Sequence, residues 1–309
     1  MNRSHLVLQA KISIDRGSKS FALASKLFRK HIRERVWMLY AWCRQCDDLA
    51  DGQDHGHGMS AVQDPKRTIA AMRMLTTRAI GGEKTGKPAF DALGIVAQEC
   101  QLPKYLASDV IDGFALDADE WQPDSEEDLF QYCYHVAGAV GCMMAIIMGI
   151  PTGDDETLDR ACDLGLAFQL SNIARDITED AEAGRCYIPR QWLAEMRIDP
   201  DNIMDAARRP ALIELVDRLC TLSESYEASA RIGAARLPFR SRWAVLAAAG
   251  IYGDIARMVK TSAGQSLEKR VVTSKSSKIH WVTKGFGQAI FKPRHKERTG
   301  LWSRTRHQI

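Results

Sequence analysis

The chain has 309 residues, of which 45% are hydrophobic and 26% are charged, a balance typical of a globular protein with its own core. The formal net charge of +3 is too small for a protein that binds nucleic acid over its whole surface. Because no stretch looks like a linker between two cores, we expect one domain. The eight cysteines are scattered and the N-terminus lacks a long apolar segment, so we expect reduced thiols in a cytoplasmic protein.

The predicted secondary structure is helical. Apolar residues recur at intervals of three and four, the period of a helix, over residues 33–50, 163–180 and 211–232. Pro210 precedes the last of these, which suits the first turn of a helix. The uncharged stretch 136–150 is shorter than the roughly 20 residues that span a bilayer, and we interpret it as a buried helix. No run of alternating β-branched residues is long enough for a sheet, so the predicted fold class is all-α.

Polar and glycine-rich stretches mark the predicted breaks between helices. They lie at residues 51–60, 80–87, 151–155 and 199–202. His55 and His57 fall in the first break, where we interpret them as solvated loop residues. Cys43 and Cys46 form a CxxC pattern inside the first helix, and because no βαβ pattern surrounds them we assign them a structural role.

Two of the predicted helices carry the same pair of carboxylates. Asp47 and Asp51 are four residues apart, as are Asp176 and Asp180, so each pair lies on one helical face. Like charges at this spacing destabilise a helix by about 0.2–0.5 kcal/mol unless a cation neutralises them. Mg²⁺ would do so, because it takes carboxylate oxygens and bridges readily to phosphate oxygens. Asn172, four residues before Asp176, adds a neutral oxygen ligand.

An arginine accompanies each pair. Arg44 lies one turn before Asp47 on the same face, whereas Arg175 directly precedes Asp176 and therefore projects about 100° away from it. Arginine binds phosphate oxygens with two parallel hydrogen bonds. Together these residues predict a magnesium-bridged diphosphate site. The alternative, ordinary solvated helix faces, explains one such pair more easily than two.

The same residues resemble the squalene/phytoene synthase family, most closely its bacterial phytoene synthases. The order and spacing match from about residue 17 to about residue 278. The matching segments are residues 18–21 (SKSF), 44–51, 132–141 (YCYHVAGAVG), 172–180 and 184–189 (GRCYIP). One departure is Asp48, which stands where the first motif of the family often has Glu. Because Asp48 is one residue off the face of Asp47 and Asp51, we do not assign it a primary ligand role.

The resemblance implies a single isoprenoid-synthase-type helical bundle around a deep central cavity that holds two prenyl diphosphates and three Mg²⁺ (or Mn²⁺) ions. The implied metal ligands are Asp47, Asp51, Asn172, Asp176 and Asp180. The implied substrate-binding residues are Ser18, Lys19, Ser20, Phe21, Arg44, Gln169, Arg175, Arg270 and Lys278. The residues implied in the catalytic steps are the four aspartates, Arg44, Arg175, Tyr132, Tyr187 and Tyr252. For each tyrosine alone, a half-buried core position is an equal alternative.

The implied reaction is the head-to-head condensation of two geranylgeranyl diphosphates, through prephytoene diphosphate, to phytoene in carotenoid biosynthesis. Small residues after the SKSF motif, namely Ala22, Ala24 and Ser25, would leave room for the long prenyl tails. No NADPH is expected, since the last step is loss of a proton. Two alternatives stay open: a dehydrosqualene or squalene synthase that uses farnesyl diphosphate, and a non-catalytic scaffold. A class I terpene cyclase or chain elongase does not fit the SKSF, YCYHVAG and GRCYIP segments.

The C-terminal part of the chain is basic. Residues 269–309 are rich in Lys and Arg, with Trp281, Phe286, Phe291 and Trp302 interleaved, a composition that suits an anionic membrane surface. We therefore expect peripheral membrane contact. The resemblance also implies contact with other enzymes of the carotenoid pathway. The alternative is a solvated tail, which we expect to be flexible from about residue 298.

Overall fold

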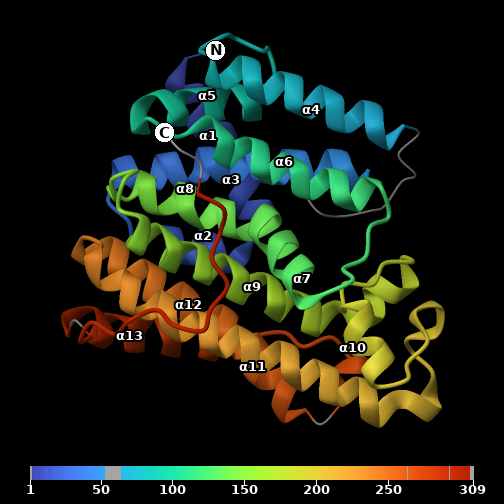
Figure 1. The fold of residues 1–309 in the computed structure, drawn as a ribbon. Coiled ribbons are helices and arrows are strands. Elements are labelled where there is room, and N and C mark those ends of the chain that lie inside the picture. The colour runs from blue at the N-terminus through green and yellow to red at the C-terminus, as the bar shows by residue number, and fades with distance from the viewer. Residues whose placement is uncertain (1, 53–63, 263, 292, 307–309) are drawn as a thin grey trace.

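The computed structural model describes residues 2–52, 64–262, 264–291 and 293–306, and over these ranges it contains helices and no strands. The prediction of an all-α fold is therefore confirmed (Figure 1). The α-helices are α1 (Arg3–Gly17), α2 (Lys19–Ser25), α3 (Lys30–Asp51), α4 (Pro65–Ile80), α5 (Pro88–Cys100), α6 (Lys104–Ala118), α7 (Glu126–Cys133), α8 (Ala139–Ile147), α9 (Asp155–Glu182), α10 (Arg190–Glu195), α11 (Arg209–Gly233), α12 (Phe239–Thr261) and α13 (Lys275–Ile290). A π-helix, η1 (Tyr134–Gly138), joins α7 to α8.

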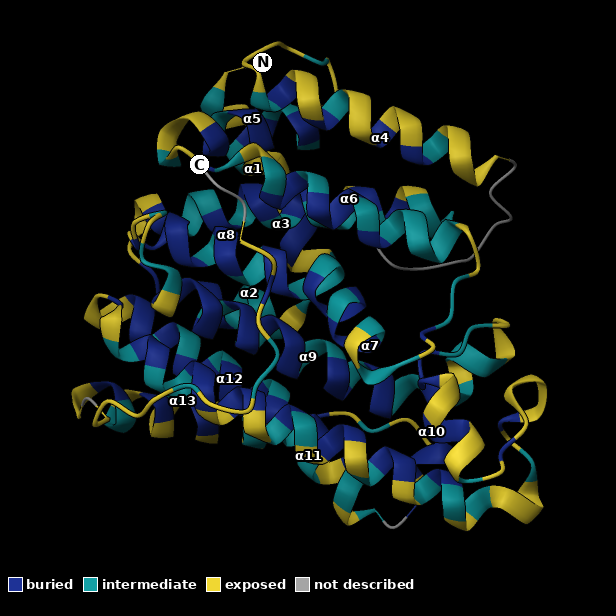
Figure 2. Cartoon of the chain, in the orientation of Figure 1, coloured by how far each residue is buried: buried dark blue, intermediate teal, exposed yellow. Residues whose placement is uncertain are grey.

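The helices form a bundle with α9 near its centre. In Figure 1, α1, α4, α5 and α6 lie at the top, and α11, α12 and α13 lie at the bottom. Helix α9 packs against α8 and η1 on one side and against α11 and α12 on the other. Figure 2 shows that the helices in the middle are mostly buried, whereas α4 and α13 present exposed residues outward. This arrangement places α9, which carries the second carboxylate pair, in the interior.

The predicted helices agree with the structure, and so do the predicted breaks at 80–87, 151–155 and 199–202, which no α-helix crosses. Most of the break predicted at 51–60 lies outside the described residues. Helices α3, α9 and α11 each contain one of the predicted helical stretches and extend it by one to eight residues at each end. Pro210 lies in the first turn of α11. Helix α3 ends at Asp51, while His55 and His57 lie outside the described residues. All eight cysteines are free.

The uncharged stretch 136–150 belongs to a continuous helical run formed by α7, η1 and α8. This run, Glu126–Ile147, is long and apolar enough to cross a membrane, but 61% of its most apolar window is buried inside the fold. It packs between α6 and α9 and stops before Pro151. The run therefore serves as a core helix, as predicted.

Glycines allow α8 and α9 to lie very close together. A Cβ atom added to Gly141 on α8 would lie 2.3 Å from the carbonyl oxygen of Ala161 on α9. One added to Gly165 on α9 would lie 2.4 Å from the carbonyl oxygen of Ala137 in η1, just before α8. Both distances are far below van der Waals contact. The backbones of the two helices are thus in direct contact, which fixes the position of α9 relative to the core.

The segment after α13 corrects one prediction. We expected a flexible tail from about residue 298, but residues 298–306 pack against α9. The guanidinium group of Arg298 pairs with Asp163, which is fully buried, at 2.7 Å. Arg304, also buried, pairs with Asp159 at 2.9 Å. Figure 1 shows this segment running from α13 across the bundle toward α8.

Candidate active site

The predicted ligands of α3 and α9 lie on a half-buried face of each helix. On α3 the half-buried positions include Tyr40, Arg44, Asp47 and Asp51. On α9 they include Phe168, Gln169, Asn172, Arg175, Asp176 and Asp180. The spacing of three and four residues in both sets is that of one helical face. Asp48, by contrast, is buried with 8% of its surface exposed, so it does not share the face of the carboxylate pair.

Arginines pair with the predicted aspartates. Arg44 forms an ion pair with Asp47. Arg175 Nε donates to Asp176 Oδ1 at 2.6 Å, and Arg270 Nε donates to the same oxygen at 2.8 Å. The Arg175 side chain is long enough to turn back toward its neighbour, which corrects the expectation that it projects away from Asp176. Arg270, 94 residues later in the chain, is brought to the site as predicted.

Arg185 is a site residue that the sequence analysis did not single out. Gly184, with φ of +73°, adopts a left-handed conformation that glycine reaches without strain, and it turns the chain sharply after α9. The Arg185 N–H then donates to the carbonyl oxygen of Asp180 at 2.8 Å, which is a common way to end a helix. From this position the guanidinium group reaches Asp51 at 2.7 Å. Arg185 therefore connects the end of α9 to the end of α3.

Asp117, at the end of α6, is a second residue that the sequence analysis missed. It accepts hydrogen bonds from the hydroxyl groups of Tyr132 at 3.0 Å and Tyr187 at 2.8 Å. The two tyrosine rings are stacked, with centroids 4.9 Å apart. Burial raises the pKa of Asp117 to about 6, although the two tyrosine hydroxyls oppose the shift. No local pattern could have revealed this residue, because its partners come from other parts of the chain.

Tyr252 belongs to a separate aromatic group. Its ring stacks on Phe168 with centroids 4.4 Å apart and lies 5.4 Å from the ring of Phe21. Phe21 also contacts the ring of Tyr40 at 6.2 Å. The predicted residues Phe21 and Tyr252 are thus in contact, whereas Tyr40 and Phe168 were not predicted.

A cavity of about 170 Å³ lies beside these groups. Five predicted residues from four segments of the chain line it: Ser20, Arg175, Tyr252, Arg270 and Lys278. Three of them are cations, which suits a ligand with several negative charges. The volume is below the roughly 300–1,000 Å³ of pockets for drug-sized ligands, so the cavity matches a phosphate head group rather than the deep space expected for two prenyl tails.

Other predicted residues have structural roles. The Ser18 hydroxyl accepts a hydrogen bond from the Phe21 N–H at 3.3 Å and so caps α2, and Lys19 is not among the residues that line the cavity. Ala24 and Ser25 are buried, and the Ser25 hydroxyl accepts a hydrogen bond from Trp37 at 2.9 Å. These two small residues therefore fill a packed interface and do not open space for a tail.

The chemistry of the predicted ligands fits a divalent cation. Burial, together with repulsion from Asp51, raises the pKa of Asp47 to about 6. Burial and the nearby Asp176 raise the pKa of Asp180 to about 7. Such shifts mean that burial disfavours the charged form of these two carboxylates, which a bound cation would stabilise. Carboxylate oxygens and an amide oxygen are the ligands that Mg²⁺ prefers, so these residues could hold it.

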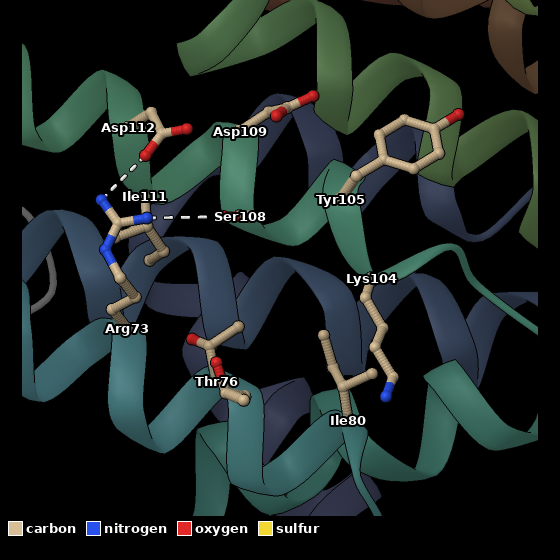
Figure 3. A pocket seen from close by; sticks show the side chains of 10 residues that line it. Arg73, Thr76, Ile80, Lys104, Tyr105, Ser108, Asp109, Ile111 and Asp112 are labelled. Atoms are coloured by element: carbon tan, nitrogen blue, oxygen red, sulfur yellow. Dashed lines mark hydrogen bonds and ion pairs between the residues drawn. The ribbon is translucent and has the colours of Figure 1, made fainter. Parts of the chain in front are cut away.

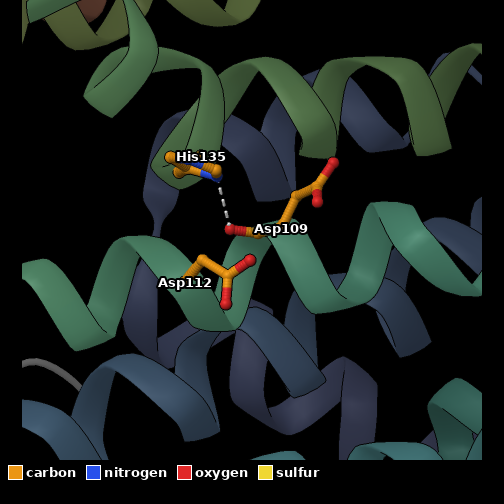
Figure 4. A group of neighbouring side chains, drawn as sticks. All are labelled: Asp109, Asp112 and His135. Atoms are coloured by element: carbon orange, nitrogen blue, oxygen red, sulfur yellow. Dashed lines mark hydrogen bonds between the residues drawn. The ribbon is translucent and has the colours of Figure 1, made fainter. Parts of the chain in front are cut away.

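A tighter cluster of potential metal ligands lies elsewhere. The side chains of Asp109, Asp112 and His135 approach within 4.8 Å of one another (Figure 4). However, one ring nitrogen of His135 pairs with Gln131 and the other with the Asp109 carbonyl oxygen. Asp112 pairs with Arg73 at 2.8 Å, and Asp109 accepts from a tyrosine hydroxyl. Because these groups are already partnered within the protein, we assign the cluster a structural role.

A larger cavity adjoins that cluster but contains none of the predicted residues. It has a volume of about 430 Å³ and lies between α4 and α6 (Figure 3). Figure 3 shows Arg73 bonded to Asp112 and Ser108 across it. Its one other lining cation, Lys104, lies at the start of α6. The cavity between α9 and α12 therefore remains the stronger candidate for an active site.

Comparison with known proteins agrees with the geometry. The model of the squalene/phytoene synthase family matches residues 14–277. The chain is 44% identical to the 15-cis-phytoene synthase of Pantoea ananas, with 94% of each chain covered. It is 42% identical to the phytoene synthase of Pseudescherichia vulneris, with 98% of this chain and 99% of the relative covered.

Solved structures of squalene and dehydrosqualene synthases have the same fold as this chain. A dehydrosqualene synthase in complex with a ligand superimposes with a TM-score of 0.81 at 25% identity, covering 92% of this chain and 96% of that chain. A squalene synthase from Alicyclobacillus acidocaldarius has the same fold, with a TM-score of 0.72 at 24% identity over 84% of this chain and 95% of that chain. The chain belongs to the squalene/phytoene synthase family.

Proposed function

We propose that the protein is a phytoene synthase that joins two molecules of geranylgeranyl diphosphate head to head, through prephytoene diphosphate, to phytoene. The observation that carries the proposal is the cavity lined by Arg175, Arg270 and Lys278, next to the carboxylate of Asp176. Cations that converge beside a carboxylate suit a diphosphate that is bound together with a metal ion. The identities of 42% and 44% to phytoene synthases support the choice of reaction.

The cations of the cavity act on the leaving group. Arg175, Arg270 and Lys278 would bind the diphosphate oxygens and stabilise the negative charge that builds up as the allylic C–O bond breaks. Asp47, Asp51, Asn172, Asp176 and Asp180 would hold Mg²⁺, or Mn²⁺ in its place. When bound, the metal supplies Lewis-acid polarisation of the diphosphate. No reductant takes part in the proposed reaction.

An aromatic group lies next to the cavity where the carbocation would form, and one of its members, Tyr252, lines the cavity. The faces of Tyr252, Phe168 and Phe21 are stacked or tilted against one another, and ring faces attract cations. Apolar walls also exclude water, which would otherwise quench the cation. Tyr132 and Tyr187, whose hydroxyls are fixed by Asp117, would steer the second, rearranging step.

A dehydrosqualene synthase is the second candidate, because the solved structure of such an enzyme superimposes on this chain over 92% of its length. The two reactions share their head-group chemistry and differ in the length of the prenyl tail. A non-catalytic scaffold, by contrast, would have no use for the complete set of aspartates and arginines in the site.

Product analysis tests the proposal. The purified protein is incubated with Mg²⁺ and either geranylgeranyl or farnesyl diphosphate, without NADPH, and the extracted hydrocarbon is identified by mass. We expect a C40 hydrocarbon from the longer substrate. A C30 hydrocarbon alone would assign the chain to the dehydrosqualene synthases, and no hydrocarbon from a folded sample supplied with detergent would contradict the enzymatic assignment.

A further inference from the structure

We propose that the outer face of α13 docks on the surface of an anionic lipid membrane, and that this contact brings the active-site cavity to the lipid. The choice of partner rests in part on the proposed function, because both the substrate and the product would be carried by a membrane. The surface itself is defined by the structure, through its apolar residues, its charge and its position beside the cavity.

An exposed apolar stripe runs along α13. Ile279, Phe286 and Ile290 are separated by seven and four residues, so at 100° per residue they lie within roughly 40° of one another on the helix. Phe291 follows directly after the helix. Their exposed fractions range from 43% for Phe286 to 77% for Phe291. Large apolar side chains gathered on one exposed face are unusual for a protein surface that contacts only water.

The stripe lies outside the core, because it is the opposite face of α13 that packs against the rest of the protein. Trp281, Gly285 and Ala289 are buried and face α12, where a Cβ atom added to Gly285 would lie 3.0 Å from the backbone nitrogen of Ala247. Helix α13 is therefore held firmly on α12 by one face and presents the other outward. Figure 2 shows this outer edge of the molecule as largely exposed.

The charge around the stripe favours an anionic partner. Residues 269–296 hold eight of the 42 Lys and Arg residues of the chain and none of its 39 Asp and Glu residues, so the remainder of the chain is net negative. Lys275, one turn before Ile279, and Lys284 are exposed. An amphipathic helix with apolar and basic residues lies in the plane of an anionic membrane surface, with its apolar face in the head-group region.

The stripe is continuous with the mouth of the active site. Val272, which is 71% exposed, precedes α13, and together with Lys278 in the first turn of the helix it lines the cavity that holds Arg175 and Arg270. A membrane that contacts Ile279 would therefore lie next to the cavity. A substrate with a lipid tail could enter from the membrane and leave its charged head among the cations.

Vesicle co-sedimentation tests this surface. The full-length protein is mixed with vesicles of phosphatidylcholine alone, or of phosphatidylcholine and phosphatidylglycerol in equal parts. We expect binding to the anionic vesicles that weakens as salt is raised. The double variant I279E/I290E should lower the affinity at least about tenfold, because it replaces two apolar side chains that would be buried in the head-group region by charged ones that the anionic lipids repel. Both positions are exposed and Glu is a good helix former, so the variant should fold.

A matched control adds the same two charges elsewhere. Leu8 on α1 and Met74 on α4 are each 55% exposed. In Figure 1 these two helices lie toward the top of the molecule, whereas α13 lies at the bottom. The variant L8E/M74E should bind anionic vesicles like the unmodified protein. Equal loss of binding in both double variants, or equal binding to neutral and anionic vesicles, would overturn the proposal.

Two further measurements distinguish membrane docking from self-association of the chain, and separate the docking surface from the proposed catalytic function. If I279E/I290E instead converts a dimer into a monomer while neither protein binds vesicles, the stripe is an interface between two copies of the chain and the proposal is wrong. Hydrocarbon formation is measured in parallel with substrate dispersed in detergent. Catalysis without vesicle binding would overturn only the docking surface, whereas vesicle binding without catalysis would overturn only the proposed function.

Discussion

Arginines hold the carboxylates of the active site in place. Asp51 pairs with Arg185, and Asp176 pairs with both Arg175 and Arg270. A bound diphosphate would offer the guanidinium groups of Arg175 and Arg270 new acceptors in the adjoining cavity. The paired arrangement therefore keeps the cations close to the position where the leaving group would be bound.

The first prediction concerns the carboxylate of Asp176. Replacing it by the neutral Asn should lower the turnover by at least about 100-fold, since loss of a metal-organising group typically costs this much. Circular dichroism and turnover are measured together. As a control, Asp15→Asn removes a carboxylate that is half exposed on α1, and it should change neither. Full activity of Asp176→Asn would contradict the assigned site.

The second prediction follows from Asp117, the pKa of which burial raises to about 6 from its ordinary value near 3.8. Because the folded state holds the proton more tightly than the unfolded state, this group lowers the stability as pH rises from about 4 through about 6. The variant Asp117→Asn lacks this titration. At pH 8 its melting temperature should be higher than that of the unmodified protein, by roughly 2–4 °C for each kcal/mol by which the charged Asp117 destabilises the fold. This difference should shrink toward pH 4. A difference that does not depend on pH would contradict the raised pKa.

At the scale of whole elements, the contact between α8 and α9 depends on glycine. Since a Cβ atom at Gly141 would lie 2.3 Å from a backbone oxygen of α9, Gly141→Ala should push the helices apart and destabilise the protein by about 1–3 kcal/mol. Gly287 on α13 has no atom within 4 Å of its added Cβ position, so Gly287→Ala should stabilise by up to about 1 kcal/mol. Urea unfolding measures both, and equal effects would contradict the close approach.

The C-terminal segment is tied to α9 by buried ion pairs. Arg298→Ala leaves the fully buried Asp163 without its cation, and should cost about 3–5 kcal/mol. Arg306, with 62% of its side chain exposed, is the matched control, and Arg306→Ala should cost no more than about 1 kcal/mol. Replacing both partners, Arg298→Met with Asp163→Leu, should recover much of the loss. An effect of Arg298→Ala as small as that of Arg306→Ala would mean that the segment is not docked.

At the scale of the whole molecule, the features that depend on local spacing could be predicted from the sequence. The helices and the two carboxylate pairs follow from intervals of three and four residues. Arg185 and Asp117 were missed because their partners come from other helices. Arg298 and Arg304 were assigned to a flexible tail because the acids they bind, Asp163 and Asp155, lie 135 and 149 residues earlier in the chain, and no local pattern reveals such a partner.

The proposed reaction joins two identical prenyl diphosphates in one site. To test it, the protein is incubated with Mg²⁺ and an equal mixture of unlabelled and deuterated geranylgeranyl diphosphate, without NADPH, and both the product masses and the diphosphate released are measured. We predict a C40 hydrocarbon in three mass forms, the mixed form twice as abundant as either pure form, with two diphosphates released for each hydrocarbon. Release of diphosphate with only a C20 alcohol as product would contradict the claim.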